Sequence, residues 1–309
     1  MSNKNNMKRI SFILIALLIV LAIVKIKENK QGERSFKSEI VAIDTSKIET
    51  ITIIPKGLGD KTVLSFETDR WVIDVEGKKV QAESNTIFEL IKQLVSLKPK
   101  RVASTLPKQW EQYELTDSLA VRIIVNDEKK PLADFMIGKF SFNQQTRQMT
   151  SYVRNTEENE VYAVDGYLSM MFNRAVESFR DNAIIIGEPE QWNKLVFKYP
   201  ADSSFTLIKQ NNTWMVNGLM ADSIKVHDYF SKIRMLTDNN FADGVELGEG
   251  IPASYSLRIE GDNFTPIEVS SYTIASDLIT TSSLNKGNKF NTNKALNVLY
   301  TNKEALMRD

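Results

Sequence analysis

Two stretches of this 309-residue chain share one plan, and this repetition constrains the fold more than any other feature of the sequence. Residues 71–104 and 214–243 each contain a tryptophan-bearing strand pattern, an Ala-acid-Ser step and an amphipathic helix pattern. A shift of 139 positions moves Ile87 onto Val226 and Leu94 onto Ile233, so both helix patterns have the same apolar face. The repetition favours two tandem modules over two unrelated domains with coincidental spacing.

Short segments of β-branched and aromatic residues surround each helix pattern, separated by turn residues. In the first half they cover 48–54, 62–66 and 71–75 before the helix, and four segments between 119 and 164 after it. The second half repeats this order, and short polar turns between neighbours are typical of antiparallel hairpins. We therefore predict an α+β fold of two modules, each a mainly antiparallel sheet with two helices. We expect the second helix of the first module to be capped by Asp165 and to reach Phe179.

An apolar run begins at Ile10, directly after the basic residues Lys4, Lys8 and Arg9, and it extends to Ile26 with Lys25 able to snorkel. Its 17 residues would give a helix of about 25 Å, close to the roughly 30 Å of a bilayer core. No small-x-small cleavage site follows the run, so an uncleaved signal anchor is favoured over a removed signal peptide or a buried soluble helix. Representative anchor residues are Ile10, Phe12, Leu17, Leu21 and Val24.

The anchor divides the chain into regions of different composition. A polar, charged stretch follows it and can span up to about 40 Å when extended, so we interpret it as a stalk. A single-pass protein with most of its chain outside the cytoplasm is expected. The predicted regions are a cytoplasmic tail at 1–9, a transmembrane anchor at 10–26, a stalk at 27–39, a first module at 40–181 and a second module at 182–309.

Composition argues against most catalytic and metal-binding classes. Lys plus Arg and Asp plus Glu both number 39, and nucleic-acid and phosphate-binding motifs are absent. The chain has no cysteine and a single histidine, His227, which makes a transition-metal site improbable. A calcium-loop interpretation of 238–249 fails at Ala242 and Asp243. We predict no enzyme activity, no catalytic residues, no metal and no cofactor; a hydrolase would need several carboxylates near His227.

Several short motifs, in a fixed order, resemble a family of bacterial proteins called domain of unknown function 4340. They are the Trp71 strand with the helix at 84–97, Tyr113-Glu-Leu115, Ile137-Gly138-Lys139, Tyr152-Val-Arg154, Val161-Tyr162, Phe179-Arg-Asp181 and Trp214-x-Val216. In the second half Ser270-Ser271 replaces the Gly138 region. The resemblance implies a membrane-anchored extracytoplasmic accessory protein, often associated with an ABC-type transport system of the kind linked to gliding motility. It implies no catalytic residues.

Two sets of residues are candidates for interaction or for structure. Trp71 and Trp214 could stack on sugars, but their equivalent positions before each helix favour core packing. A shift of 128 positions aligns Arg180-Asp181 with Arg308-Asp309, and these pairs could bind a partner or stabilise a helix end. Any site is expected between the modules, near 182–192.

The combined interpretation is a non-catalytic accessory or scaffold protein in the bacterial inner (cytoplasmic) membrane. Its expected partners are the membrane and integral-membrane transporter subunits, without nucleic acid. The alternative is a membrane-tethered glycan- or peptide-binding module, and exposure of the two tryptophans on a groove would favour it.

Overall fold

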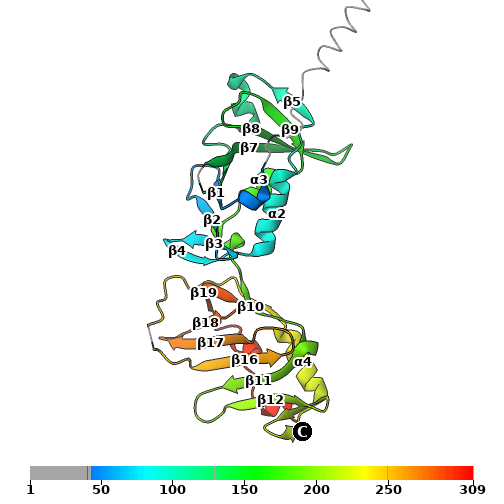
Figure 1. The fold of residues 1–309 in the computed structure, drawn as a ribbon, viewed down its shortest axis with the longest axis vertical. Helices are drawn as coiled ribbons and strands as arrows, with labels where there is room; N and C mark the ends of the chain where they lie inside the picture. The colour runs from blue at the N-terminus through cyan, green and yellow to red at the C-terminus, as the bar shows by residue number, and fades with distance from the viewer. Residues whose placement is uncertain (1–39, 41–42, 129, 249, 309) are drawn as a thin grey trace, which may run out of the picture.

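Two antiparallel sheets dominate the computed structural model, which describes residues 40, 43–128, 130–248 and 250–308 (Figure 1). The sheets follow one another along the chain and stack end to end, the first above the second in that view. Helices are few, so the described chain is mostly β. The predicted pair of mainly antiparallel sheet modules is confirmed.

The first sheet has the strand order β4-β3-β2-β1-β6-β7-β8-β9-β5, and all its strand pairs are antiparallel. The elements of this module are β1 Thr50–Ile54, β2 Thr62–Glu67, β3 Arg70–Val75, β4 Lys78–Gln81, α2 Ser84–Val95, β5 Arg101–Ser104, β6 Val121–Asn126, β7 Pro131–Asn143, β8 Gln148–Asn155, β9 Val161–Asp165 and α3 Leu168–Phe172, with 3-10 helices at Thr45–Lys47, Pro107–Gln109, Glu111–Tyr113 and Val176–Phe179.

The second sheet repeats this order as β14-β13-β12-β11-β16-β17-β18-β19, so each strand has a counterpart in the first sheet. A separate two-stranded sheet joins β10 to β15. The elements are β10 Ala183–Ile186, β11 Trp192–Lys198, β12 Phe205–Gln210, β13 Thr213–Val216, β14 Leu219–Met220, α4 Ser223–Ile233, β15 Met235–Thr237, β16 Tyr255–Gly261, β17 Ile267–Ile274, β18 Asp277–Ser282, β19 Asn285–Asn291 and α5 Leu296–Leu299, with 3-10 helices at Pro189–Gln191 and Glu304–Leu306.

The long helices α2 and α4 begin and pack as their sequences predict. Glu83 caps α2, its carboxylate accepting hydrogen bonds from the Asn85 and Thr86 amides, and Asp222 caps α4 in the same way. In each helix most residues of the predicted apolar stripe are buried against the sheet of their own module, and Ile91 of α2 is half-buried. Each helix therefore closes one hydrophobic core.

The prediction for the second helix of the first module is wrong. The helix after Asp165 is only five residues long (α3), and a separate 3-10 helix follows at Val176–Phe179. Asp165 does not cap it, because Asp165 ends β9 and pairs with Lys100 at 2.7 Å. Strand β7 continues past Gly138 through a bulge to Asn143 and forms a long hairpin with β8.

The aligned Arg-Asp pairs are out of register by one residue. Arg180 forms a bridge with Ala82, and the counterpart bridge from Ala221 goes to Met307. The structural equivalent of Arg180 is therefore Met307, and Arg308 is an exposed neighbour. Asp309 lies outside the described residues.

The predicted anchor residues Ile10, Phe12, Leu17, Leu21 and Val24 also lie outside the described residues, as does the 27–39 stretch. Within residues 40, 43–128, 130–248 and 250–308, no helix has the length and apolar character that crossing a membrane requires.

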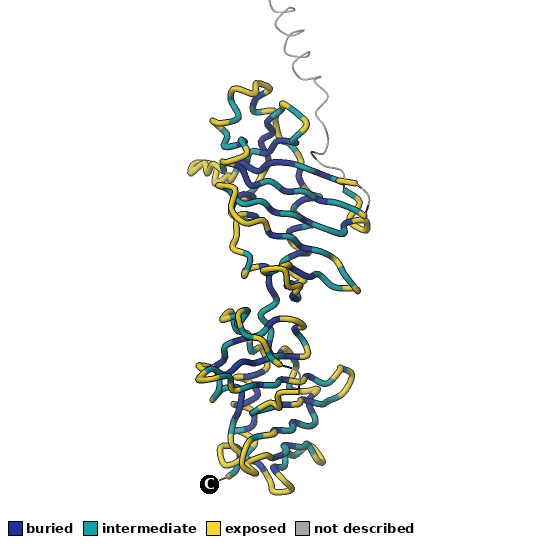
Figure 2. The backbone as a smooth tube through the Cα atoms, turned by 90° about the vertical axis from the view of Figure 1, so that its left-hand side faces the viewer, coloured by how far each residue is buried: buried dark blue, intermediate teal, exposed yellow. Residues whose placement is uncertain are grey.

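The chain passes from the first module to the second as one segment of buried and half-buried residues (Figure 2). Strand β4, at one edge of the first sheet, lies against β19, at one edge of the second. Gly287 in β19 has φ +86, and a Cβ atom there would lie 3.0 Å from the Lys79 carbonyl oxygen. Glycine thus permits the close approach of the two sheet edges.

Candidate functional site

Arg180 is the centre of the contact between the modules. Its guanidinium donates two hydrogen bonds to the Asp243 carboxylate, both of 2.7 Å, and two to Asn288 Oδ1, of 2.7 and 2.9 Å. The face of the guanidinium lies over the Phe241 ring at 3.6 Å. The Arg180 side chain is only 1% exposed, so these contacts replace its hydration.

Side-chain amides complete this junction. Asn288 donates to the Gln81 carbonyl at 2.9 Å, and the Gln81 amide donates to the Asp181 carboxylate at 2.8 Å. Burial raises the pKa of Asp181, whereas the hydrogen bond from Arg180 lowers the pKa of Asp243. The direct contact between the modules is therefore made by a hydrogen-bonded network.

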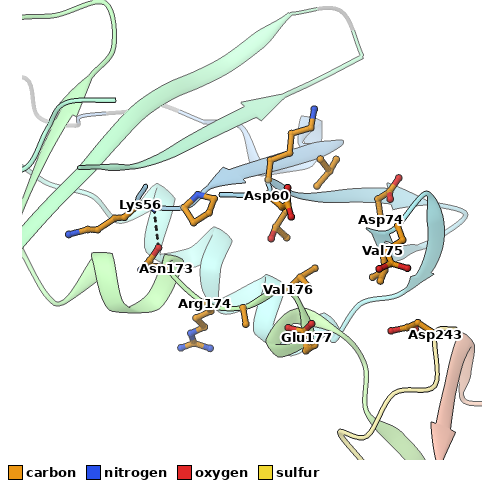
Figure 3. Close-up of a pocket in the computed structure, with 15 residues that line it drawn as sticks. Lys56, Asp60, Asp74, Val75, Asn173, Arg174, Val176, Glu177 and Asp243 are labelled. Carbon is orange, nitrogen blue, oxygen red and sulfur yellow. Dashed lines mark hydrogen bonds between the residues drawn. The ribbon is translucent and has the colours of Figure 1, made fainter. Parts of the chain in front are cut away.

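A cleft of about 930 Å³ lies beside the junction (Figure 3). The turns after β1 and β3 and the segment after α3 form it, and Asp243 reaches one end from the second module. Three of its charged groups have partners within the protein: Asp74 accepts from the Gly77 amide, Asp243 binds Arg180, and Lys56 pairs with Glu114 at 2.6 Å. The cleft is also lined by Asp60, Lys61, Arg174 and Glu177. The cleft has both signs of charge and no dominant apolar surface.

A second cavity, of about 470 Å³, has a different character. Phe88 and Ile91 of α2 form one wall, and Phe66 and Trp71 form the other, with their ring centroids 5.5 Å apart. Phe88 is 64% exposed and Phe66 is 46% exposed, while Trp71 is half-buried. We call this surface the Trp71 groove, lined by Thr45, Ser46, Ile48, Phe66, Trp71, Phe88, Ile91, Lys92 and Val95.

Among the described residues of the second module, polar side chains occupy two of the positions that form the walls of the Trp71 groove. The cross-strand partner of Trp214 is Lys209, at the position that Phe66 has opposite Trp71. The shift of 139 that superposes the helix patterns places His227 at the position of Phe88. In addition, the buried Phe230 packs edge-on against Trp214 at 5.0 Å. Two of the four wall residues, Phe66 and Phe88, are thus apolar only in the first module.

The remaining candidates have ordinary surroundings. Trp214 is half-buried at the edge of the second core, and His227 is exposed on α4. Asp238 accepts a hydrogen bond from the Asn240 amide in a local turn, and Glu249 is outside the described residues. In the part of the chain that the structure describes, no group of three or more His, Cys, Asp or Glu side chains is placed to hold a metal ion.

Sequence reasoning did not single out Arg154 as a candidate, although it belongs to one of the quoted motifs. Arg154 is buried, stacks on the Trp110 ring at 3.8 Å and donates to three backbone carbonyls. Gly138, from another motif, lies against the Tyr113 carbonyl oxygen. Together these motif residues surround a small second core, on the side of the sheet away from α2, which includes Leu115, Ala120, Met136 and Val161. The motifs that contain Gly138 and Arg154 therefore serve the packing of this core.

The family model described as domain of unknown function (DUF4340) matches residues 71–258, more than half of the chain. The match includes Trp71, Phe88, Arg180 and Asp243. No curated protein and no solved structure matches the chain.

Proposed function

Because the chain belongs to the DUF4340 family, we propose that it is a non-catalytic, membrane-anchored accessory or scaffold protein outside the cytoplasm. The observation that carries the proposal is the Trp71 groove, an exposed apolar surface in which Phe66 and Phe88 stand where the second module has Lys209 and His227. Exposed aromatic clusters on soluble domains mark sites of interaction.

The lining of the groove favours a protein partner. Its walls are aromatic and aliphatic, and the polar groups, including Thr45, Ser46 and Lys92, are few. An apolar segment of another protein can bury Phe88 and Phe66 without leaving polar groups unpaired. A glycan presents many hydroxyl groups, which need more hydrogen-bonding partners than this groove offers. A tethered glycan- or peptide-binding module is the second candidate, favoured by the half-exposed Trp71.

The location and the partner class have separate support. The apolar run at 10–26 supports a single-pass anchor in the bacterial cytoplasmic membrane, with the modules outside. The association with an ABC-type transport system of the gliding-motility kind rests on the family resemblance alone. We accordingly propose that the apolar segment that binds in the Trp71 groove belongs to a membrane subunit of the transporter.

The junction around Arg180 supports a scaffold role. A buried, bidentate arginine with a second hydrogen-bonding partner holds the two modules at a fixed spacing. A protein that sets the distance between partners needs such a fixed arrangement.

Photo-crosslinking in native membranes tests the proposal at matched positions. A photoreactive amino acid at Phe88 of the full-length protein should capture integral-membrane transporter subunits, identified by mass spectrometry. The same residue at His227, the counterpart on α4, should capture none. Replacing the groove walls with the residues of the second module (Phe66→Lys with Phe88→His) should abolish co-purification of those subunits, by roughly 10-fold or more.

Three other results would contradict the proposal. Recovery of the protein alone after mild extraction would count against an accessory subunit. Equal capture at Phe88 and His227 would remove the groove as the binding surface. The glycan-binding alternative would be favoured by two results together. Co-purification would be retained in Phe66→Lys with Phe88→His, and soluble glycans would quench the tryptophan fluorescence of the wild type but not of Trp71→Ala.

A further inference from the structure

The β7–β8 hairpin extends beyond the body of the first sheet and carries exposed apolar side chains. Strand β6 accompanies β7 only as far as Ile137, yet β7 and β8 continue to pair, with Phe142 opposite Met149. Residues that face each other across a pair, or are two apart along a strand, share a face, so Phe140 joins them. Phe142 is 51% exposed, and Phe140 and Met149 are also exposed.

Helix α3 enlarges this apolar surface. Met170 in α3 is exposed and lines a cavity together with Phe140, and Tyr167 just before α3 is exposed as well. The first core does not use these side chains. The hairpin therefore has an apolar face without a partner and an opposite face of small polar residues, including Ser141, Asn143 and Gln148.

The charge of the hairpin has one sign. Between Asp134 and Glu157 the sequence contains no acidic residue, while Lys139 and Arg147 flank the hairpin tip. Arg147 is exposed in the turn. Aromatic side chains beside cationic ones are suited to the headgroup region of an anionic lipid surface. Glu114 lines the same cavity as Lys139 and Phe140, and it is paired with Lys56.

The hairpin lies at the end of the sheet where the described chain begins. The Ile40 amide donates to the Leu97 carbonyl at 3.3 Å, just before β5. Lys100 then pairs with Asp165 at the end of β9, and the amide that follows Asp165 donates to the Met149 carbonyl at 3.0 Å. With the anchor of the proposed function, an extended 27–39 stretch places Ile40 at most about 40 Å from the membrane, and the hairpin lies at the same end of the sheet as Ile40.

We propose that the β7–β8 hairpin is a second membrane contact, which inserts Phe140, Phe142 and Met149 shallowly into an anionic lipid surface. The proximity of the hairpin to the membrane rests on the anchor in the proposed function; the chemistry of the contact does not. Two contacts, the anchor and the hairpin, fix the orientation of the first module above the bilayer and present the Trp71 groove in one direction.

A single fluorescent label tests this contact, since the chain has no cysteine of its own. Gln145→Cys at the hairpin tip and Ser276→Cys at the matched β17–β18 turn are each labelled with an environment-sensitive dye. The full-length protein is reconstituted into nanodiscs rich in phosphatidylglycerol that carry a nitroxide-labelled headgroup lipid. We expect at least ~2-fold stronger quenching at Gln145 than at Ser276, lost in Phe140→Ser with Phe142→Ser and reduced in Arg147→Glu.

The outcomes separate the hairpin from the anchor. Protein that enters the discs with equal quenching at both positions overturns the hairpin contact and leaves the anchor intact. Protein that fails to enter the discs overturns the anchor. In that case, vesicles are added to the labelled full-length protein to test the hairpin contact. The contact stands only if the emission of the dye at position 145 shifts to the blue with phosphatidylglycerol vesicles and does not shift with phosphatidylcholine vesicles. A response only in native membranes overturns lipid contact in favour of a protein partner.

Discussion

At the scale of single residues, two buried arginines are held in contrasting ways. Arg180 has an ionised partner, Asp243, and donates hydrogen bonds to that carboxylate and to Asn288. Arg154 donates to backbone carbonyls and stacks on Trp110, and burial lowers the pKa of its guanidinium. Arg180 is paired across the junction and therefore couples the two modules. Arg154 is held by carbonyls close to it in the chain and therefore stabilises only its own hairpin.

The pH dependence of stability should report the Asp243 carboxylate. The hydrogen bond from Arg180 holds the pKa of Asp243 below its unfolded-state value, so the ionised carboxylate stabilises the folded chain above about pH 4. This stabilisation is lost as the pH falls through the folded-state pKa. Asp243→Asn should therefore unfold more easily in urea than the wild type near neutral pH, and the difference should narrow as the pH falls below about 4.

Asp181 provides a control of opposite sign. Burial raises its folded-state pKa, so its ionisation weakens the folded state as the pH rises through that pKa. Relative to the wild type, Asp181→Asn should gain stability with rising pH over this window. Parallel curves for the two variants would contradict the assignment of both carboxylates.

Sequence reasoning identified Arg180 and Asp181 as a notable pair but not the partner of Arg180. Asp243 is 63 residues away along the chain, in a segment that was considered as a calcium loop. A pairing between modules depends on how two folded units meet, and a local pattern contains no information about that contact.

At the scale of elements, periodicity predicted α2 and α4 and their caps because apolar spacing and capping are local properties. The same alignment places His227 at the position of Phe88, so this difference between the two modules could be predicted from the sequence. The Phe66 and Lys209 difference needs strand register, which only the structure provides. The break after α3 has no glycine or proline to mark it, and the polar tip of the β7–β8 hairpin resembles an ordinary loop.

Gly138 shows how an element can depend on a missing side chain. A Cβ atom there would lie 2.1 Å from the Tyr113 carbonyl oxygen, in the bulge that lets β7 continue into the hairpin. Gly138→Ala must displace the 3-10 turn that covers the small second core, and we expect a loss of about 3 kcal/mol in the free energy of unfolding. Gly244→Ala, which meets no atom within 4 Å, is the control for urea denaturation. Equal losses would show that the bulge tolerates a side chain.

At the scale of the whole molecule, the junction determines whether the modules unfold together. Arg180→Met installs the residue that the second module has at the equivalent position, Met307, and leaves Asp243 and Asn288 without their cation. We expect a loss of roughly 3 kcal/mol and two separate unfolding transitions, resolved by hydrogen exchange with mass spectrometry. Arg308→Met, at an exposed site, should unfold like the wild type. One cooperative transition in both variants would contradict coupling through Arg180.

The meeting of β4 and β19 has a consequence for aggregation. An edge strand offers unpaired backbone groups to any other strand that approaches it, and this is a common route to non-native association. Here each sheet shields one edge of the other, through the Asn288 contact to Gln81 and the close approach at Gly287. A module released by proteolysis or truncation would expose that edge. The junction thus also protects the chain from aggregation through these edge strands, and this protection requires both modules.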